Sequence, residues 1–264
     1  PAGPVAPARL AAGLACLGDA FTVRLAPSLT AARAPGTPSY LAAPDDVRAA
    51  ELMAMIADPD VRAILCARGG YGIARILPAL DADALRRDPK PIIGFSDATA
   101  LLAWAHRAGV RPIHGPVVAQ LADLPAADVA LLIEVMTSPR PLGARPWPLT
   151  VPAGGGPPGA PPPEPSAEPI TGPIIPANLT LASMLVGTPW ALPLAGAIAL
   201  LEEVGERPYE LDRYLTQLAM TGALADVRAV VLGDLVRCRD PSPPAGEPDP
   251  DDAARAAVLE RLAA

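Results

Sequence analysis

The chain has 264 residues, of which 51% are hydrophobic and only 3% aromatic, and its formal net charge is −7. This apolar fraction is enough for a buried core, whereas few aromatic residues, a negative charge and no basic stripe argue against a nucleic-acid partner. The three cysteines, Cys16, Cys66 and Cys238, are too few and too scattered for a disulfide framework or a metal site. We expect reduced thiols in a cytoplasmic protein, with Cys66 as a small buried hydrophobe.

No window approaches 18 uninterrupted apolar residues, so no membrane span is predicted, and no signal peptide is recognisable. The chain opens with PAGPVAPARL, without an initiator methionine, and closes with DDAARAAVLERLAA, a helix-like stretch that has no stop signal. We therefore expect both ends to be cut.

The first half of the chain alternates helix-like and strand-like segments. Such alternation with short loops predicts an α/β domain with a parallel sheet over residues 1 to about 145. In chain order we predict a helix over 7–18, a strand over 21–25 (FTVRL), a helix over 44–57, a buried strand over 61–67 (VRAILCA), a helix over 73–88, a strand over 90–95, a helix over 96–109 and a strand over 111–117.

A stretch of almost pure Pro, Gly and Ala divides the chain. We predict three parts: an N-terminal α/β domain over 1–149, a semi-rigid linker or exposed hairpin over 150–169, and a C-terminal domain over 170–264. In the last part, strands interleaved with helices are expected within 173–190, 195–224 and 227–238.

Two loops follow predicted strands, where open α/β sheets bind ligands. In ARGGYG (67–72) the paired glycines let the backbone approach a ligand and aim N–H groups at it, although a plain glycine turn explains them equally well. In GFSD (94–97), Ser96 either caps the following helix or is a nucleophile on a sharp strand-to-helix turn. The usual G-x-S-x-G pattern is not met, because Ala98 occupies the last glycine position.

An activated serine needs a base and an acid that orients it. Glu202 ends the apolar run AIALL and is the best acid candidate, whereas Glu203 and Glu206 are more easily explained as solvated loop charges. The two histidines, His106 and His114, are both better explained by structural roles.

Taken in order, the blocks ARGGYG, GFSD, HGP, NLTLASMLVGTPW and LLEEVGE resemble the L,D-carboxypeptidases of the murein-recycling type. These enzymes share a peptidase family with the microcin-immunity carboxypeptidases, and ARGGYG and HGP favour the murein-recycling branch. The resemblance runs from the first residues to about residue 240. It implies an N-terminal α/β nucleophile domain and a smaller C-terminal mixed α/β domain, with the active site between them.

The resemblance also implies roles for single residues. Ser96 would be the nucleophile of a Ser-Glu-His triad and Glu202 its acid, with oxyanion donors on the backbone N–H of Asp97 and of one glycine in the pair Gly69 and Gly70. Arg68, Tyr71 and Asn178 are candidates for binding substrate. The implied reaction is release of terminal D-alanine from a cytoplasmic muropeptide, without a metal or organic cofactor, by a homodimer.

The family's first strand would precede Pro1, and its triad histidine would follow Ala264. We therefore expect that the full chain supplies the histidine, or else that the protein is a catalytically impaired relative that still binds muropeptides. Two further alternatives are a microcin-immunity type of peptidase acting on peptidyl nucleotides and a generic α/β binding protein.

Overall fold

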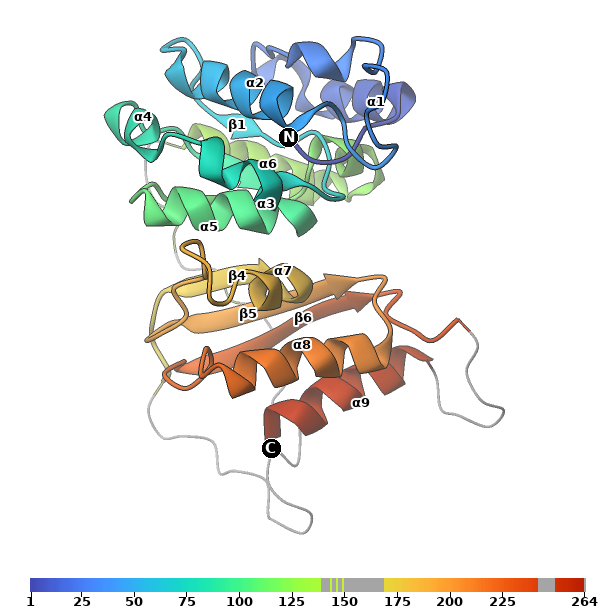
Figure 1. Cartoon of the computed structure of the whole chain (residues 1–264), viewed down its shortest axis with the longest axis vertical. Coiled ribbons are helices and arrows are strands. Elements are labelled where there is room, and N and C mark those ends of the chain that lie inside the picture. Colours follow the sequence, from blue (N-terminus) through green and yellow to red (C-terminus); the bar gives the residue numbers. More distant parts are fainter. Residues whose placement is uncertain (139–142, 144–145, 147–148, 150–168, 242–249, 264) are drawn as a thin grey trace. The chain divides into compact units, whose positions relative to one another are not determined.

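The computed structural model describes residues 1–138, 143, 146, 149, 169–241 and 250–263. The chain divides into two compact units, Pro1–Gly143 and Ala144–Ala264, and each contains its own three-stranded parallel sheet (Figure 1). The two-domain α/β class predicted from the sequence is confirmed. The predicted linker lies outside the described residues except for Pro169, so the predicted domain boundaries stay a prediction.

The sheet of the first unit has three short parallel strands in the order β1-β2-β3. β1 is Ile64–Leu65, β2 is Ile92–Gly94 and β3 is Ile113–His114. Isoleucine dominates these strands because β-branched side chains suit a pleated surface that is covered on both faces. Ile92 and Ile93 accordingly have no exposed surface.

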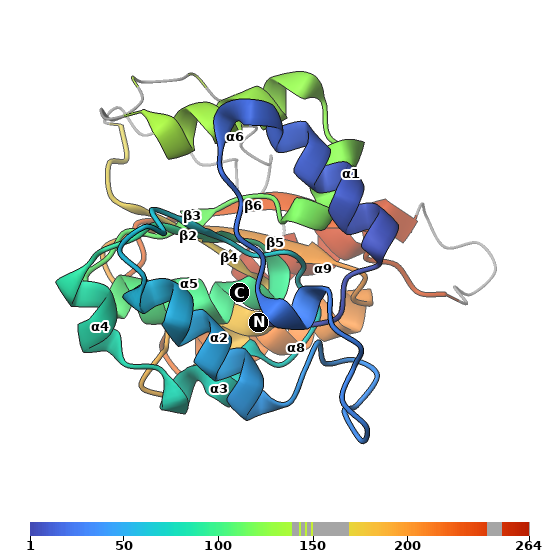
Figure 2. The ribbon, with the colours of Figure 1, turned by 90° about the horizontal axis from the view of Figure 1, so that it is seen from above.

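Helices cover both faces of this sheet. In Figure 2, α1 and α6 lie on one side of β2 and β3, and α2, α3, α4 and α5 lie on the other. The α-helices are α1 (Pro7–Leu17), α2 (Asp45–Ala57), α3 (Ile73–Ile76), α4 (Ala82–Arg87), α5 (Thr99–Arg107) and α6 (Ala126–Thr137). Short 3₁₀ helices occupy Gly18–Ala20, Pro27–Leu29, Leu77–Ala79, Ser96–Ala98 and Val118–Asp123.

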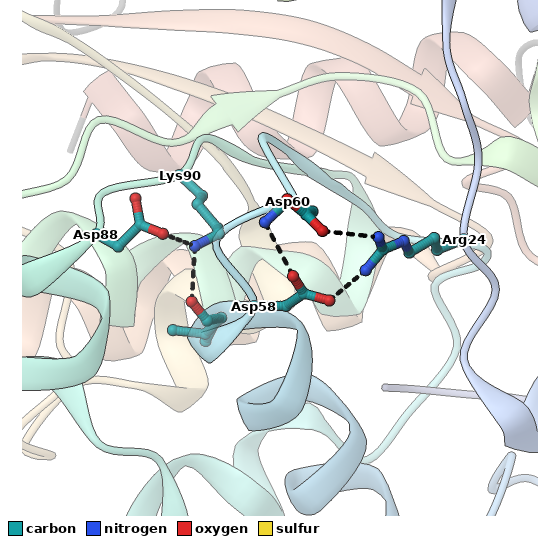
Figure 3. A network of polar contacts seen from close by, with 6 residues as sticks. Arg24, Asp58, Asp60, Asp88 and Lys90 are labelled. Carbon is teal, nitrogen blue, oxygen red and sulfur yellow. Dashed lines mark hydrogen bonds and ion pairs between the residues drawn. The ribbon is translucent and has the colours of Figure 1, made fainter.

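The predicted strand over FTVRL is wrong, because residues 21–25 belong to no strand and most of them are exposed. Figure 3 shows what holds the segment instead: the Arg24 guanidinium forms ion pairs with Asp58 and with Asp60, at 3.2 Å from the latter, just beyond the end of α2. Alternating apolar residues form a strand only if an open sheet edge pairs with them. Here side-chain ion pairs to a neighbouring loop fix the segment.

Lys90, the only lysine of the chain, is fully buried where the chain enters β2. Its ammonium donates a hydrogen bond to the Ile56 carbonyl oxygen, with 2.8 Å between Nζ and O, and pairs with Asp88 (Figure 3). A buried ammonium needs such partners, because desolvation disfavours a charge that has none. Lys90 thus ties the C-terminal end of α2 to the start of β2.

The single helix predicted over 73–88 is interrupted. The chain forms the short α3, a 3₁₀ turn over Leu77–Ala79 and then α4. Pro78 lacks an N–H and cannot continue the helical hydrogen-bond pattern. Asp81 then starts α4 as its N-cap, accepting a hydrogen bond from the Asp83 N–H at 2.8 Å.

The second unit contains a parallel sheet in the order β4-β5-β6, with helices α7, α8 and α9. Pro176 lies in the middle of β4, which tolerates it because β4 is an edge strand of this sheet. Leu201 on β5, Leu211 and Leu215 on α8, and Val258 on α9 share one buried core, and Figure 1 shows α8 and α9 beside this sheet. The bounds are β4 (Ile174–Asn178), α7 (Leu179–Met184), β5 (Ile198–Val204), α8 (Pro208–Met220), β6 (Ala229–Val236) and α9 (Pro250–Ala263).

Within the described part of the chain, no helix has the length and apolar character needed to cross a bilayer.

Candidate active site

Ser96 lies two residues beyond β2 in a backbone conformation that is rare for a residue with a side chain. Its φ is 61°, and Arg237 is the only other described non-glycine residue with a positive φ. Phe95 before it is extended, and a 3₁₀ turn that leads into α5 starts at Ser96 itself. The N-cap of that turn is therefore Phe95, so the capping role considered for Ser96 is not found. A strained serine between a strand and a helix has the geometry of a nucleophile elbow.

The glycine loop after β1 packs against this serine. A Cβ atom placed on Gly69 would lie 2.9 Å from Ser96 Cβ and 3.1 Å from Ser96 Oγ, so only glycine allows the approach. The structure therefore brings together the two loops that the sequence singled out. Parallel pairing of β1 with β2 explains this, because the carboxyl ends of both strands meet at one edge of the sheet.

Main-chain contacts fix how the loop is turned. The Gly69 carbonyl oxygen accepts a hydrogen bond from the Gly3 N–H at 3.1 Å. All peptide bonds of the described chain are trans, so the Gly70 N–H points away from Gly3, opposite to the Gly69 carbonyl. Either Gly69 or Gly70 was predicted to donate its N–H to an oxyanion. The hydrogen bond between Gly3 and Gly69 fixes the direction of the Gly70 N–H.

Two buried charged side chains, neither singled out by the sequence for this purpose, hold the far end of the loop. The Asp97 carboxylate, 3% exposed, accepts a hydrogen bond from the Ile73 N–H at 3.0 Å, and the Arg48 guanidinium, 1% exposed, donates to the Gly72 carbonyl oxygen at 3.0 Å. Burial raises the pKa of Asp97, while hydrogen bonds from the loop and the charge of Arg48 oppose that rise. The residue after the serine therefore anchors the glycine loop as well.

Arg68 and Tyr71 flank the loop on its exposed side. The Arg68 guanidinium donates to the Pro4 carbonyl oxygen, and the Tyr71 ring meets Tyr40 edge-on with 5.6 Å between the centroids. Tyr71 is 49% exposed. Both side chains are therefore within reach of a ligand in solution.

In the second unit, Glu202 lies near the carboxyl end of β5, opposite a β-bulge. Leu201 pairs with Leu232 but Glu203 pairs with Leu235, so Gly233 and Asp234 of β6 face the single residue Glu202. A Cβ on Gly233 would lie 3.3 Å from Glu202 Cβ. Bulges commonly redirect a side chain beside a functional site.

The surroundings of Glu202 favour its protonated form. Burial, the adjacent Glu203 and Asp234 raise the pKa of Glu202 to about 8, although a hydrogen bond from Asn178 favours the ionised form. A strongly raised pKa at a strand end is typical of a functional carboxyl group.

The interpretation of Glu203 as a solvated loop charge is wrong. Glu203 lies within β5, is 3% exposed, and forms hydrogen bonds with Asn178, Thr180 and Val204. The apolar run AIALL predicts a strand that ends at Glu202. The run IALLEEV in fact stays in the sheet through Val204, with three consecutive buried residues at 201–203.

The two histidines have different settings. His106 is exposed near the C-terminal end of α5. His114 ends β3, half-buried, with its ring edge-on to Phe95 at 5.7 Å between centroids, and burial lowers its pKa to about 4. His114 is therefore a neutral imidazole at physiological pH.

Cys66 is 1% exposed at the end of β1, and burial raises the pKa of its thiol, as expected for a buried hydrophobe. Across the ranges that the structure describes, no group of three His, Cys, Asp or Glu residues is arranged to hold a metal ion.

Two protein-family models match the chain. The LD-carboxypeptidase N-terminal domain matches residues 1–115, and the LD-carboxypeptidase C-terminal domain matches residues 171–264. Protein SCO6489 of Streptomyces coelicolor, named as a carboxypeptidase, is 39% identical over 242 residues, which cover 90% of this chain and 74% of that protein. The murein tetrapeptide carboxypeptidase of Pseudomonas aeruginosa is 35% identical over 205 residues, which cover 75% of this chain and 64% of that protein.

Solved structures of proteins with a similar fold include carboxypeptidases as well. The muramoyltetrapeptide carboxypeptidase of Oxalobacter formigenes has a TM-score of 0.74 at 25% identity, covering 99% of this chain and 84% of that one. The microcin C7 self-immunity protein MccF, in complex with aspartyl sulfamoyl adenosine, has a TM-score of 0.75 at 20% identity, covering 97% and 81%, and so shares the fold. The chain spans 62% and 60% of the curated relatives from Synechocystis and Bacillus subtilis.

Proposed function

This chain belongs to the LD-carboxypeptidase family, and from that membership we propose that it is a serine carboxypeptidase that releases terminal D-alanine from murein tetrapeptides. The observation that carries the proposal is the left-handed Ser96 with the backbone of Gly69 packed against it. This contact brings the backbone of the glycine loop close to a strained serine, and acyl transfer needs main-chain N–H groups near its nucleophile.

In the proposed reaction, Ser96 Oγ attacks the carbonyl carbon of the last peptide bond. The negative charge that develops on the carbonyl oxygen is held by the N–H groups of Asp97 and Gly70, and each such donor typically lowers the barrier by about 3 kcal/mol. The bond to nitrogen then breaks, D-alanine leaves with the proton that the serine lost, and water hydrolyses the acyl-enzyme.

Glu202 is proposed as the acid that orients the base. An ionised carboxylate accepts the imidazole N–H and stabilises the imidazolium that forms when the serine is deprotonated. A pKa of about 8 keeps most of Glu202 protonated at neutral pH until a cationic partner favours its charge. The chain spans only about 60% of the length of some curated relatives, so activity is to be measured on the full-length protein.

Arg68 and Tyr71 are proposed to bind the substrate's terminal carboxylate and the peptide beside it. Both flank the glycine loop, and Arg68 supplies the cation that a carboxylate requires. A role in peptidoglycan recycling, a cytoplasmic location and a homodimer stay predictions that rest on the resemblance.

The test is to incubate the full-length protein with a muramyl tetrapeptide and to measure released D-alanine. Wild-type protein should release it, whereas Ser96→Ala should lose activity by several orders of magnitude. Ser28→Ala is a matched control, because Ser28 is held by Glu51, and it should retain activity. Release that survives Ser96→Ala would contradict the nucleophile assignment.

The same assay separates the alternatives. A peptidase of the microcin-immunity type would cleave a peptidyl nucleotide and leave the tetrapeptide intact. A catalytically impaired relative would bind the tetrapeptide without releasing D-alanine and would not react with a serine-directed phosphonate.

A further inference from the structure

The Glu203 carboxylate, next to Glu202 on β5, accepts four hydrogen bonds. Oε1 accepts from Asn178 Nδ2 at 2.6 Å and from the Val204 N–H at 2.8 Å. Oε2 accepts from the Thr180 N–H at 2.8 Å and from Thr180 Oγ1 at 2.7 Å. A carboxylate that is 3% exposed and accepts four hydrogen bonds is held in one orientation.

The Asn178 carboxamide is equally constrained. Its Oδ1 caps α7 by accepting from the Leu181 N–H at 3.2 Å, which fixes which way the amide faces. Its Nδ2 group donates to Glu203, and the side chain also forms a hydrogen bond with Glu202. A carboxamide has two N–H donors. One donor directed to each glutamate uses both.

We propose that Glu203 is a positioning residue that acts through Asn178 to orient the Glu202 carboxyl group, so that Asn178 serves this acid and not the substrate. The inference rests on the proposed function for the part that concerns catalysis, since Glu202 is the proposed triad acid. It also replaces the substrate-binding role predicted for Asn178.

The position of Glu202 in the sheet explains why its side chain needs an additional contact to hold it in place. Glu202 faces the bulge of β6, and regular pairing on that side stops at Leu201 and resumes only at Glu203. On the other side, Asn178 is the register partner of Glu202. The Glu203–Asn178 contact therefore supplies, from β4, the constraint that the bulge removes on β6.

Two negative charges act on Glu202, and they differ in what they touch. Glu203 comes from the same strand and contacts Asn178, whereas Asp234 comes from β6, is exposed, and acts on Glu202 through its charge. Asp234→Asn thus removes a nearby charge without altering the network. Glu203→Gln removes a charge and also an acceptor oxygen of the network.

The first measurement needs no catalysis. In the ¹⁵N-labelled chain, the Asn178 side-chain NH₂ protons should exchange slowly with solvent, and their shifts should follow the ionisation of Glu202. Asn178→Asp assigns these signals. Fast exchange together with shifts that do not move with pH would overturn the proposal, whatever happens with the variants.

The second measurement compares kcat/KM of full-length variants on a muramyl tetrapeptide at a pH where Glu202 is ionised in all of them. Loss of orientation in Glu203→Gln should lower kcat/KM by about 10²-fold. Asp234→Asn should stay at the wild-type value. Equal losses in the two variants would mean that charge alone matters, and the proposal would be wrong.

Thr180→Val provides a milder variant should Glu203→Gln fail to fold, because it removes one donor and keeps the Glu203 charge. It should show faster Asn178 exchange and a smaller loss of kcat/KM; no change in either would count against the proposal. The failures are distinguishable: D-alanine release that survives Ser96→Ala contradicts the proposed function and leaves the exchange result intact.

Discussion

Gly69→Ala tests the proposed oxyanion loop most directly. The added Cβ would lie 2.9 Å from Ser96 Cβ, 3.1 Å from Ser96 Oγ and 3.3 Å from the Phe95 carbonyl oxygen. Carbon atoms normally approach to about 3.5 Å, so the loop and the serine must separate by roughly 0.6 Å. Gly69 is not among the glycines with positive φ, so the substitution adds bulk without forbidding the backbone conformation.

The expected effect is larger on activity than on folding. Overpacking typically costs about 1–3 kcal/mol of stability. A displacement of about 1 Å at reacting groups can cost about 10²-fold in rate, so a shift of roughly 0.6 Å should cost at least about tenfold. Both kcat for D-alanine release and the rate at which a serine-directed phosphonate labels Ser96 should fall together, because both need the oxyanion donors in place.

Gly115→Ala is the matched control. Gly115 follows β3 in the same sheet, and a Cβ placed there would meet its nearest neighbours at 3.7 Å, an ordinary contact. That variant should label at the wild-type rate. If Gly69→Ala also labels at the wild-type rate while thermal unfolding shows it to be folded, the glycine loop does not serve Ser96.

Two further predictions concern buried ionisable groups. Between pH 6.5 and 8 the contribution of Glu202 to the free energy of unfolding should fall by about 1.4 kcal/mol per pH unit, because folded Glu202, with a pKa of about 8, keeps a proton that the unfolded chain has lost. Between pH 4.5 and 6.5 burial lowers the pKa of His114 to about 4, and the resulting rise in stability with pH should offset the fall caused by Glu202. In denaturant unfolding, the stability of Glu202→Gln should not fall above pH 6.5. A fall as large as that of the wild type would refute the assignment of this pKa to Glu202. An amine-reactive ester should spare Lys90 in the folded chain and modify it in urea, because the ammonium is buried against Ile56 and Asp88. Labelling of native Lys90 as fast as that of a lysine peptide, measured by peptide mass spectrometry, would contradict its burial.

Much of the fold follows from local patterns. Helical spacing identified α1 and α2, and short β-branched runs identified β1, β2 and β3. The errors have local physical causes as well. Pro78 breaks a helix whose apolar spacing continues past it, and Arg24 holds FTVRL through ion pairs that no periodicity reveals.

The candidate site was harder to predict for residues whose role depends on contacts between segments that are distant in the sequence. A serine before a helix is most often a cap, so only the φ of Ser96 distinguishes the two interpretations. The sequence does contain a signal for Arg48. It lies four residues before Leu52 and eight before Ile56, and this helical spacing puts all three on the buried face of α2. Glu203 left no such signal, because period-2 alternation would turn it away from Glu202, whereas residues 201–203 of β5 are all buried.

The glycine loop relies on buried charges because the short strands of the first unit offer little else. β1 and β3 have two residues each, so few ladder hydrogen bonds fix the segments that follow them. In each unit, buried charged groups bind main-chain or amide groups next to the functional residue: Arg48 and Asp97 hold the glycine loop beside Ser96, and Glu203 holds Asn178 beside Glu202. A buried charged group must keep its hydrogen-bond partners, because the loss of one partner leaves part of its desolvation free energy uncompensated. Five of the eight buried polar residues in the described chain, Arg48, Asp97, Asn178, Glu202 and Glu203, belong to these two arrangements. Conservative changes at these five positions should therefore affect activity more than a change of equal size at an exposed charged residue away from both arrangements, such as Arg62.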